Sequence, residues 1–158
     1  MSNYENCVID PGQFPIFEAL DGSREVQGLI SAESCDAQDM AAGLWWLHPG
    51  EECDTDIHPD ASEIYYVVSG EGVLRLGDDR YPVRKGMVVY IPQGVEHQTF
   101  NTGDEDLCYF WTFAPPPSGQ SLAERQGWKQ VELPVQAIRS SITSPPNWLS
   151  CLNRPAWK

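Results

Sequence analysis

Short apolar segments separated by turn signals fill the middle of the chain. Between residues 24 and 114, eight segments of five to eight residues are rich in Val, Ile, Tyr, Phe and Trp. They read REVQGLIS, MAAGLWWL, EIYYVVSG, GVLRL, YPVRK, MVVYIP, EHQTFNT and LCYFWTF. Gly, Pro and Asp occupy the connections, and no stretch keeps a helical period. The pattern predicts an all-β antiparallel barrel or sandwich rather than alternating strands and helices.

The two ends differ from this middle part. Residues 1–23 are loop-like, with an edge strand expected near FPIFEAL, and form an N-terminal arm. Residues 115–158 form a C-terminal arm, in which SLAERQGWKQ predicts a short helix with Ser121 as N-cap and Gly127 near its end. The last segment is rich in Pro and Ser but carries two tryptophans, so we expect it to pack on the barrel or on a partner subunit.

Size, charge and cysteine content narrow the class of protein. A chain of 158 residues suits one domain, and it includes no apolar run long enough to span a membrane. Residues 1–12 lack the basic and apolar pattern of a secretory signal, so we expect none. The five cysteines are scattered and odd in number, which favours reduced thiols and a cytoplasmic location. The net charge of −13 argues against nucleic acids and anionic membranes as partners.

The stretch DTDIHPDASE places metal-ligand side chains directly before a predicted strand. Asp56 and His58 are two residues apart and share one face of an extended segment, and Glu63 follows across a Pro-containing turn. A second imidazole, His97, starts the strand after PQG. A carboxylate inside a barrel is costly unless a cation neutralises it. Two interpretations stay open: a divalent metal site, or two surface turns whose side chains never meet.

The same stretch resembles the first signature motif of the cupin superfamily. That motif runs Gly, five residues, His-x-His, three or four residues, Glu, six residues, Gly. Here Gly50 is followed by five residues, then Asp56 and His58, then four residues before Glu63, and six more before Gly70. The chain departs from the motif at one position, where Asp56 replaces the first histidine.

A later stretch resembles the second cupin motif, which runs Gly, five residues, Pro-x-Gly, two residues, His, three residues, Asn. Here Gly86 is followed by five residues, Pro92 and Gly94, then His97 after two more residues and Asn101 after a further three. The resemblance covers about residues 24–114 and leaves both arms outside. It implies a small single-domain cupin with a jelly-roll (double-stranded β-helix) barrel.

The resemblance also implies a metal site. His58, Glu63 and His97 would be ligands, and Asp56 would be a fourth ligand, a general base beside the metal, or a hydrogen-bond partner of a ligand. Two imidazoles with carboxylates suit Fe(II), which we favour, as well as Mn, Zn or Ni.

Pocket residues follow from the alternation along the same strands. Tyr65 shares a face with Glu63, and could be catalytic together with Asp56. Thr99 and Asn101 share a face with His97 and are further pocket candidates. Arg75 is a candidate because its charge suits an anionic substrate, and the alternative is a solvated position on the surface. Two points stay open: which residues of the strand 107–113 face inward, and which of Trp45 and Trp46 does. His48 matches no ligand position, and we expect it to be structural or to lie at the rim.

We expect the partner of this protein to be a small molecule, and three classes of function remain open. The favoured one is a non-haem Fe(II) oxygenase or dioxygenase acting on a small oxygenated metabolite. The second is a redox-neutral lyase, isomerase, epimerase or cyclase that uses the metal to polarise a carbonyl. The third is a non-catalytic binding or sensor protein. Small cupins are commonly homodimers, so the resemblance also implies a homodimer.

Overall fold

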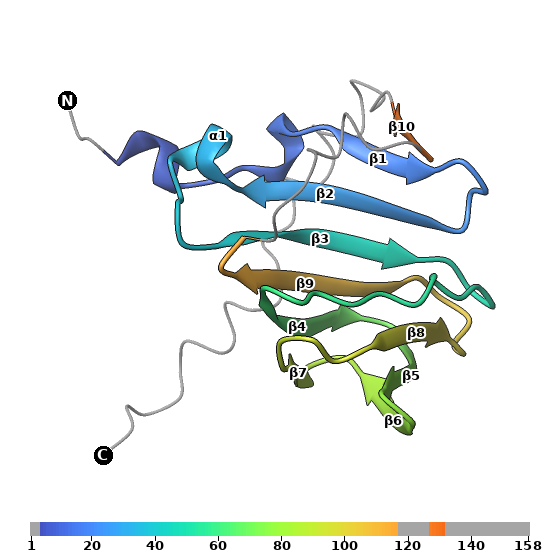
Figure 1. The fold of residues 1–158 in the computed structure, drawn as a ribbon. Coiled ribbons are helices and arrows are strands. Elements are labelled where there is room, and N and C mark those ends of the chain that lie inside the picture. The colour runs from blue at the N-terminus through green and yellow to red at the C-terminus, as the bar shows by residue number, and fades with distance from the viewer. Residues whose placement is uncertain (1–3, 117–126, 132–158) are drawn as a thin grey trace, which may run out of the picture.

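The computed structural model describes residues 4–116 and 127–131. Its strands form one seven-stranded and one three-stranded sheet, in the orders β10-β1-β2-β3-β9-β4-β7 and β6-β5-β8. The strands are β1 Ile16–Ala19, β2 Arg24–Ile30, β3 Ala41–Leu47, β4 Ser62–Ser69, β5 Glu71–Leu76, β6 Asp79–Arg84, β7 Val88–Ile91, β8 His97–Asn101, β9 Leu107–Ala114 and β10 Trp128–Val131. In Figure 1 the members of the larger sheet follow one another from β1 down to β4.

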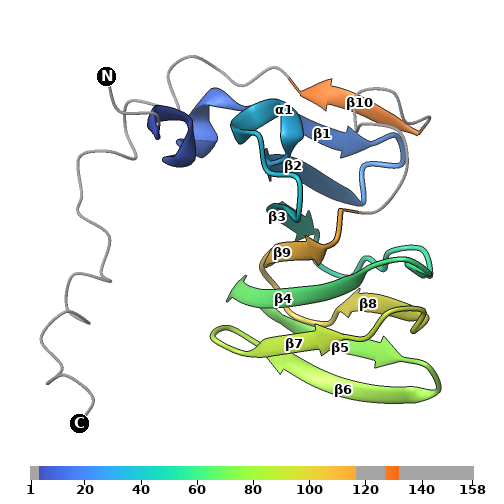
Figure 2. The same cartoon turned by 60° about the vertical axis from the view of Figure 1, so that its left-hand side comes forward.

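Each apolar segment expected between residues 24 and 114 forms one strand, β2 to β9. All strand pairs are antiparallel, and β3–β9 and β4–β9 each pair over almost their full length. In the lower half of the molecule, β4 and β7 of the larger sheet and β5 and β8 of the smaller sheet form the barrel (Figure 2). Strands β1, β2 and β10 extend the larger sheet above it. The expectation of an all-β jelly-roll barrel is confirmed.

Strands also form in both predicted arms. The strand expected near FPIFEAL is β1, but it does not lie at the edge of the sheet, because β10 pairs with its outer side. The ion pair between Lys129 Nζ and Glu18 Oε2, 2.8 Å long, joins these two strands. Of the stretch SLAERQGWKQ, which was predicted to form a helix from Ser121, residues 121–126 lie outside the described residues, and Trp128–Gln130 belong to β10 instead of a helix. The tryptophan-bearing C-terminal segment also lies outside the described residues.

Helices are short in the described parts of the chain. They are η1 Glu5–Cys7, η2 Pro11–Gln13 and α1 Ala32–Cys35. The hydroxyl of Ser31 caps α1 by accepting hydrogen bonds from the amides of Glu33 and Ser34, each 3.2 Å long. Within residues 4–116 and 127–131, no helix is long and apolar enough to cross a membrane.

The core lies between the two sheets and settles how β9 is oriented. Tyr109 is fully buried and stacks on Trp45 of β3 and on Tyr65 of β4, with ring centroids 5.4 and 4.5 Å apart. Leu107, two residues earlier, is also fully buried in this cluster. Alternation therefore turns Leu107, Tyr109, Trp111 and Phe113 inward, which is one of the two orientations left open by the sequence.

Candidate metal centre

Two strands and one connection bring the candidate ligands together. Glu63 is the second residue of β4 and His97 the first of β8, and both side chains point into the barrel, where each is only 3–4 % exposed. Asp56 and His58 belong to the connection between β3 and β4. Asp56 and His97 form an isolated antiparallel bridge, in which each backbone amide donates to the other carbonyl, at 2.8 and 2.9 Å. This bridge fixes the first motif against the second.

The side-chain atoms of the four residues converge on a small volume. The ligand atoms of Asp56, His58 and His97 all lie within 4.8 Å of one another. Glu63 Oε2 lies 3.3 Å from His97 Nε2 and 3.7 Å from His58 Nε2, while Asp56 Oδ2 lies 3.5 Å from His58 Nε2. Ligand atoms that share a metal at roughly 2.1 Å lie about 3.0–3.5 Å from one another. The observed spacing is therefore close to that of a metal shell.

The environment of Glu63 gives a second observation that fits a cation. Among the described residues, Glu63 Oε2 is one of two buried side-chain oxygens without a hydrogen-bond partner. Burial raises the pKa of Glu63, although His97 and His58 oppose the shift. The pKa of His97 is also raised, because its contacts with Glu63 and the Val95 carbonyl outweigh burial. A divalent ion between these groups would neutralise the buried carboxylate and use its free oxygen.

Asp56 differs from Glu63 in its exposure to solvent. Its side chain is 61 % exposed, against 4 % for Glu63. Its Oδ1 accepts a hydrogen bond from the amide of Ile57 at 2.8 Å, which leaves Oδ2 facing His58. One carboxylate thus lies on the buried side of the two imidazoles and the other on the solvent side. This arrangement leaves all three roles predicted for Asp56 open.

Aromatic side chains surround the imidazoles. Phe113 packs edge-on against His58 with ring centroids 4.5 Å apart, and Trp111 lies beside Phe113 at 5.3 Å. Tyr65 lies edge-on to His97 at 6.3 Å. Burial, followed by the nearby charge of Glu63, raises the pKa of Tyr65 well above its ordinary value. The shift moves deprotonation of the Tyr65 hydroxyl further from neutral pH, where it can donate a hydrogen bond.

The other predicted pocket residues have different surroundings. Thr99 is buried inside the barrel, one inward position beyond His97 on β8. Asn101 lies at the opposite end of β8, where its amide donates to the carbonyls of Leu47 and Glu105 at 2.7 and 2.9 Å. The structure does not bring Asn101 to the four converging side chains.

Arg75 does not join the four converging side chains either. Arg75 pairs with Gln98 of β8, which alternates with the inward His97 and Thr99, so both lie on the outer face of the three-stranded sheet. Its guanidinium binds protein groups there. His48, which matched no ligand position, contacts Asp106 through Nδ1 at 2.9 Å.

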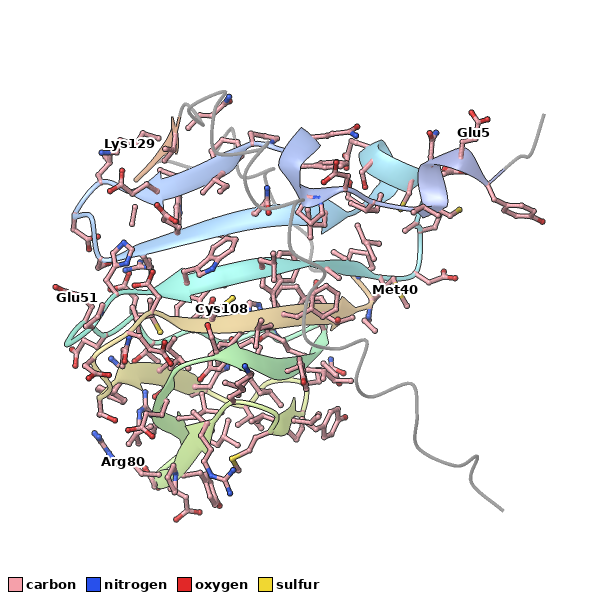
Figure 3. All side chains as sticks on the ribbon, turned by 180° about the vertical axis from the view of Figure 1, so that it is seen from behind. Glu5, Met40, Glu51, Arg80, Cys108 and Lys129 are labelled. Carbon is pink, nitrogen blue, oxygen red and sulfur yellow. The ribbon has the colours of Figure 1, made fainter. Side chains whose placement is uncertain are left out.

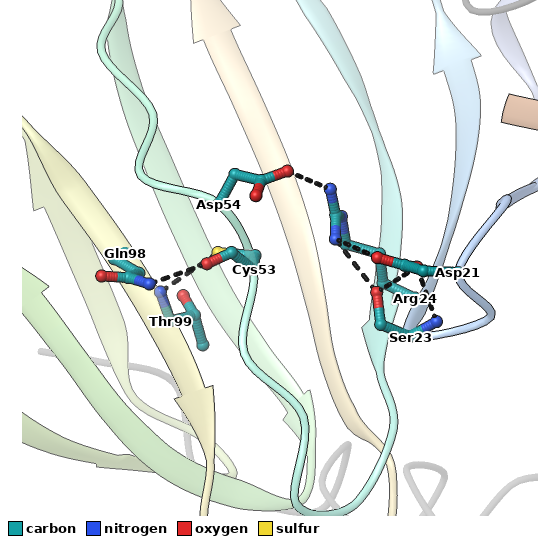
Figure 4. Close-up of polar contacts among 7 residues, drawn as sticks. All are labelled: Asp21, Ser23, Arg24, Cys53, Asp54, Gln98 and Thr99. Carbon is teal, nitrogen blue, oxygen red and sulfur yellow. Dashed lines mark hydrogen bonds and ion pairs between the residues drawn. The ribbon is translucent and has the colours of Figure 1, made fainter. Parts of the chain in front are cut away.

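Sequence reasoning missed the groups that hold residues 53–56. Cys53, which matches no ligand position of the two motifs, accepts a hydrogen bond from the amide of Thr99 through its sulfur at 3.2 Å, and its carbonyl accepts one from Gln98 at 2.9 Å. Arg24 of β2 binds Asp54 at 2.7 Å (Figure 4). Nothing in the local pattern indicates these contacts, because the partners lie about 30 to 46 residues apart.

Comparison with known proteins bears on both fold and site. The cupin-domain family model matches residues 43–113, which include both motifs. An uncharacterised protein of Streptomyces coelicolor is 37 % identical over 81 residues, which are 51 % of this chain and 75 % of that protein. A glucose-6-phosphate isomerase of Thermococcus onnurineus is 40 % identical over 96 residues, 56 % of this chain and 50 % of the isomerase.

A solved structure extends the likeness beyond the motifs. The crystal structure of a predicted oxalate decarboxylase from Thermotoga maritima matches with a TM-score of 0.59 and 26 % identity, covering 68 % of this chain and 98 % of that one. Cupins usually bind a divalent metal, and Asp56, His58 and His97 form a candidate site for one here. The two motifs, the antiparallel barrel and these relatives together show that the chain belongs to the cupin superfamily.

Proposed function

We propose that this cupin is a metal-dependent enzyme that moves a proton on a small carbonyl compound without net oxidation, as a lyase, isomerase or cyclase does. The observation that carries the proposal is the pair of carboxylates on opposite sides of two imidazoles. Glu63 is buried and 3.3 Å from His97, whereas Asp56 is exposed and 3.5 Å from His58. Besides the buried carboxylate, the site therefore carries a second one that faces solvent and can accept a proton.

Each side chain has a role in this proposal. His58, Glu63 and His97 would hold a divalent cation, which when bound polarises a substrate carbonyl. Asp56 lies on the solvent side, where a substrate arrives, and would remove a proton from the carbon next to that carbonyl. Tyr65 is protonated at neutral pH and would donate a hydrogen bond to the developing oxyanion.

The surroundings favour a substrate with a flat apolar part. Tyr65, Trp111 and Phe113 are half-buried aromatic side chains around the two imidazoles. Arg75, which the sequence suggested for an anionic substrate, binds protein groups on the outer face of the sheet. We therefore expect a small ketone or enol with an apolar ring rather than a phosphorylated sugar. The isomerase relative supports the redox-neutral reaction and not its particular substrate.

A second candidate function rests on a different subset of the same residues. His58, Glu63 and His97 alone form a two-histidine, one-carboxylate set, which in non-haem Fe(II) oxygenases leaves open coordination positions. In that case Asp56 would bind or orient the substrate rather than remove a proton.

Metal content and the oxygen requirement decide between the candidates. The protein is purified without chelator, its metal is measured by mass spectrometry, and small ketones and enols are tested with and without oxygen. Turnover that continues without oxygen and is lost in Asp56→Asn supports proton transfer. Turnover that stops without oxygen supports the oxygenase. Tight binding of a small molecule without any turnover would favour the binding or sensor class instead.

A further inference from the structure

Residues 50–56 run along β8 without forming a regular strand. The amides of Gly50, Cys53 and Asp56 donate to carbonyls of β8 at 3.2, 3.1 and 2.8 Å. Isolated bridges pair Glu52 with Phe100 and Asp56 with His97, so four residue steps on this segment lie opposite three on β8. The extra residue makes a bulge. Asp54 and Thr55, directly before Asp56, take no part in the backbone hydrogen bonds between this segment and β8.

Arg75 binds residues 50–56 from the outer face of the three-stranded sheet. Its Nη1 donates to Glu96 Oε1 at 2.7 Å and to the Gly77 carbonyl at 2.8 Å, while its Nη2 donates to Thr55 Oγ1 at 2.9 Å. Thr55 precedes Asp56 and Glu96 precedes His97. One guanidinium, only 17 % exposed, thus binds the neighbours of two candidate metal ligands. The planar fork of arginine suits this double attachment better than the single ammonium of lysine.

Arg24 holds the same segment from the seven-stranded sheet. Its Nη2 donates to Asp54 Oδ2 at 2.7 Å, and its Nη1 donates to Ser23 Oγ at 3.0 Å (Figure 4). The guanidinium also lies 5.5 Å from the centroid of the Trp128 ring. Arg24 is 14 % exposed although its partner Asp54 is 90 % exposed, so the arginine is the fixed member of this pair.

We propose that Arg75 and Arg24 are positioning residues that hold Thr55 and Asp54 and thereby reinforce the backbone bridge between Asp56 and His97. Neither arginine touches the ligand atoms themselves. The proposal rests on the metal-dependent function only for its second consequence, namely that freeing residues 54 and 55 weakens metal binding. The Asp56 carboxylate lies 3.5 Å from His58 Nε2, so its negative charge favours a cation there even when it is not a ligand. The first consequence, a less protected backbone at Asp56, holds whether or not a metal binds.

The test compares Arg75→Ala, Arg75→Lys and Arg24→Ala with Arg80→Ala as a matched control. Arg80 lies directly across from Arg75 in the β5–β6 pair, but its guanidinium stacks over Phe100 at 4.6 Å and projects outward (Figure 3). Its removal changes the charge equally without touching residues 53–56.

Hydrogen exchange of the metal-free protein tests whether the two arginines hold residues 54 and 55, independently of metal binding. We expect Arg75→Ala to speed exchange of the Asp56 amide by about tenfold or more, with Arg75→Lys and Arg24→Ala intermediate and Arg80→Ala unchanged. Exchange in Arg75→Ala that equals that of Arg80→Ala would overturn the proposal. A wild-type protein that binds no metal would contradict the proposed function and leave this measurement intact.

Metal affinity then shows whether the effect of Arg75 on the metal centre depends on Asp56. Titration calorimetry with Mn²⁺ is expected to give about tenfold weaker binding for Arg75→Ala, in the range seen when groups behind metal ligands are removed. In an Asp56→Ala background, the same substitution is expected to have no further effect. An equal loss in both backgrounds would mean that Arg75 affects the whole barrel and does not position Asp56.

Discussion

Gly43 of β3 pairs with Gly28 of β2 and lies against the side chain of Trp111, next to the metal centre. A Cβ at this position would be 1.9 Å from the Gln27 carbonyl oxygen and 2.6 Å from Cζ2 of Trp111. Ordinary van der Waals contact begins at 3.4 Å, so β2 and β3 would have to separate by more than about 1 Å. Gln27 cannot shift freely, because its side chain donates to the carbonyls of Pro11 and Phe14 at 2.8 and 2.9 Å.

We therefore expect Gly43→Ala to lower the free energy of unfolding by about 3 kcal/mol, the upper end of the usual cost of overpacking. For a domain of this size that is a fall in Tm of roughly 6–12 °C. Mn²⁺ affinity should fall as well, because Trp111 packs on Phe113 and Phe113 on His58.

The control for this experiment is Gly77→Ala, measured by the same urea unfolding of metal-free protein. Gly77 has φ +57°, and nothing lies within 4 Å of the point that a Cβ would occupy, so its substitution carries only the left-handed backbone cost of about 1–2 kcal/mol. A smaller loss for Gly43→Ala than for Gly77→Ala would refute the steric argument.

Three further predictions concern pH, thiol reactivity and assembly. In metal-free protein, Glu63 has a pKa raised above 4.5 and His97 one raised above 6.5, so the native state holds extra protons and stability should fall as pH rises through these values. Glu63→Gln should flatten this dependence between pH 4.5 and 8 in urea titrations, and an unchanged slope would contradict it. Burial, with help from Asp106, raises the pKa of Cys108 to about 12, so at about pH 8 iodoacetamide should label the exposed Cys7 in native protein and spare Cys108, as peptide mass spectrometry can check. The predicted homodimer should form through the outward face of β4 and β7, where Tyr66 and Val88 pair and are 45 and 65 % exposed. Tyr66→Glu should then sediment as a monomer where wild type sediments as a dimer, and two identical profiles would argue against this surface.

The sequence by itself determined the strands and the identity of the candidate ligands. Apolar alternation with Gly and Pro turns marks β2 to β9, because strand formation depends on a period of two residues that is readable locally. The resemblance to the two cupin motifs identified His58, Glu63 and His97, although these residues lie in a connection and on two different strands.

Tertiary structure decided which face of each strand lies inside and what surrounds the ligands. Either orientation of residues 107–113 satisfies the local pattern, since both sets of side chains are largely apolar. Only pairing with β3 and β4 turns Tyr109 inward, onto Trp45 and Tyr65. Register on both sides of a strand is a long-range property that its own residues do not encode.

The role of Arg75 could not be predicted from the sequence either. Its charge suggested a substrate contact, whereas β5–β8 pairing places it on the outer face, bound to Thr55 and Glu96. The partners of a charged side chain depend on which distant segments pack beside it. The sequence therefore determined the candidate ligands of this cupin, and the packing of residues 50–56 against β8 decided how Asp56 faces them.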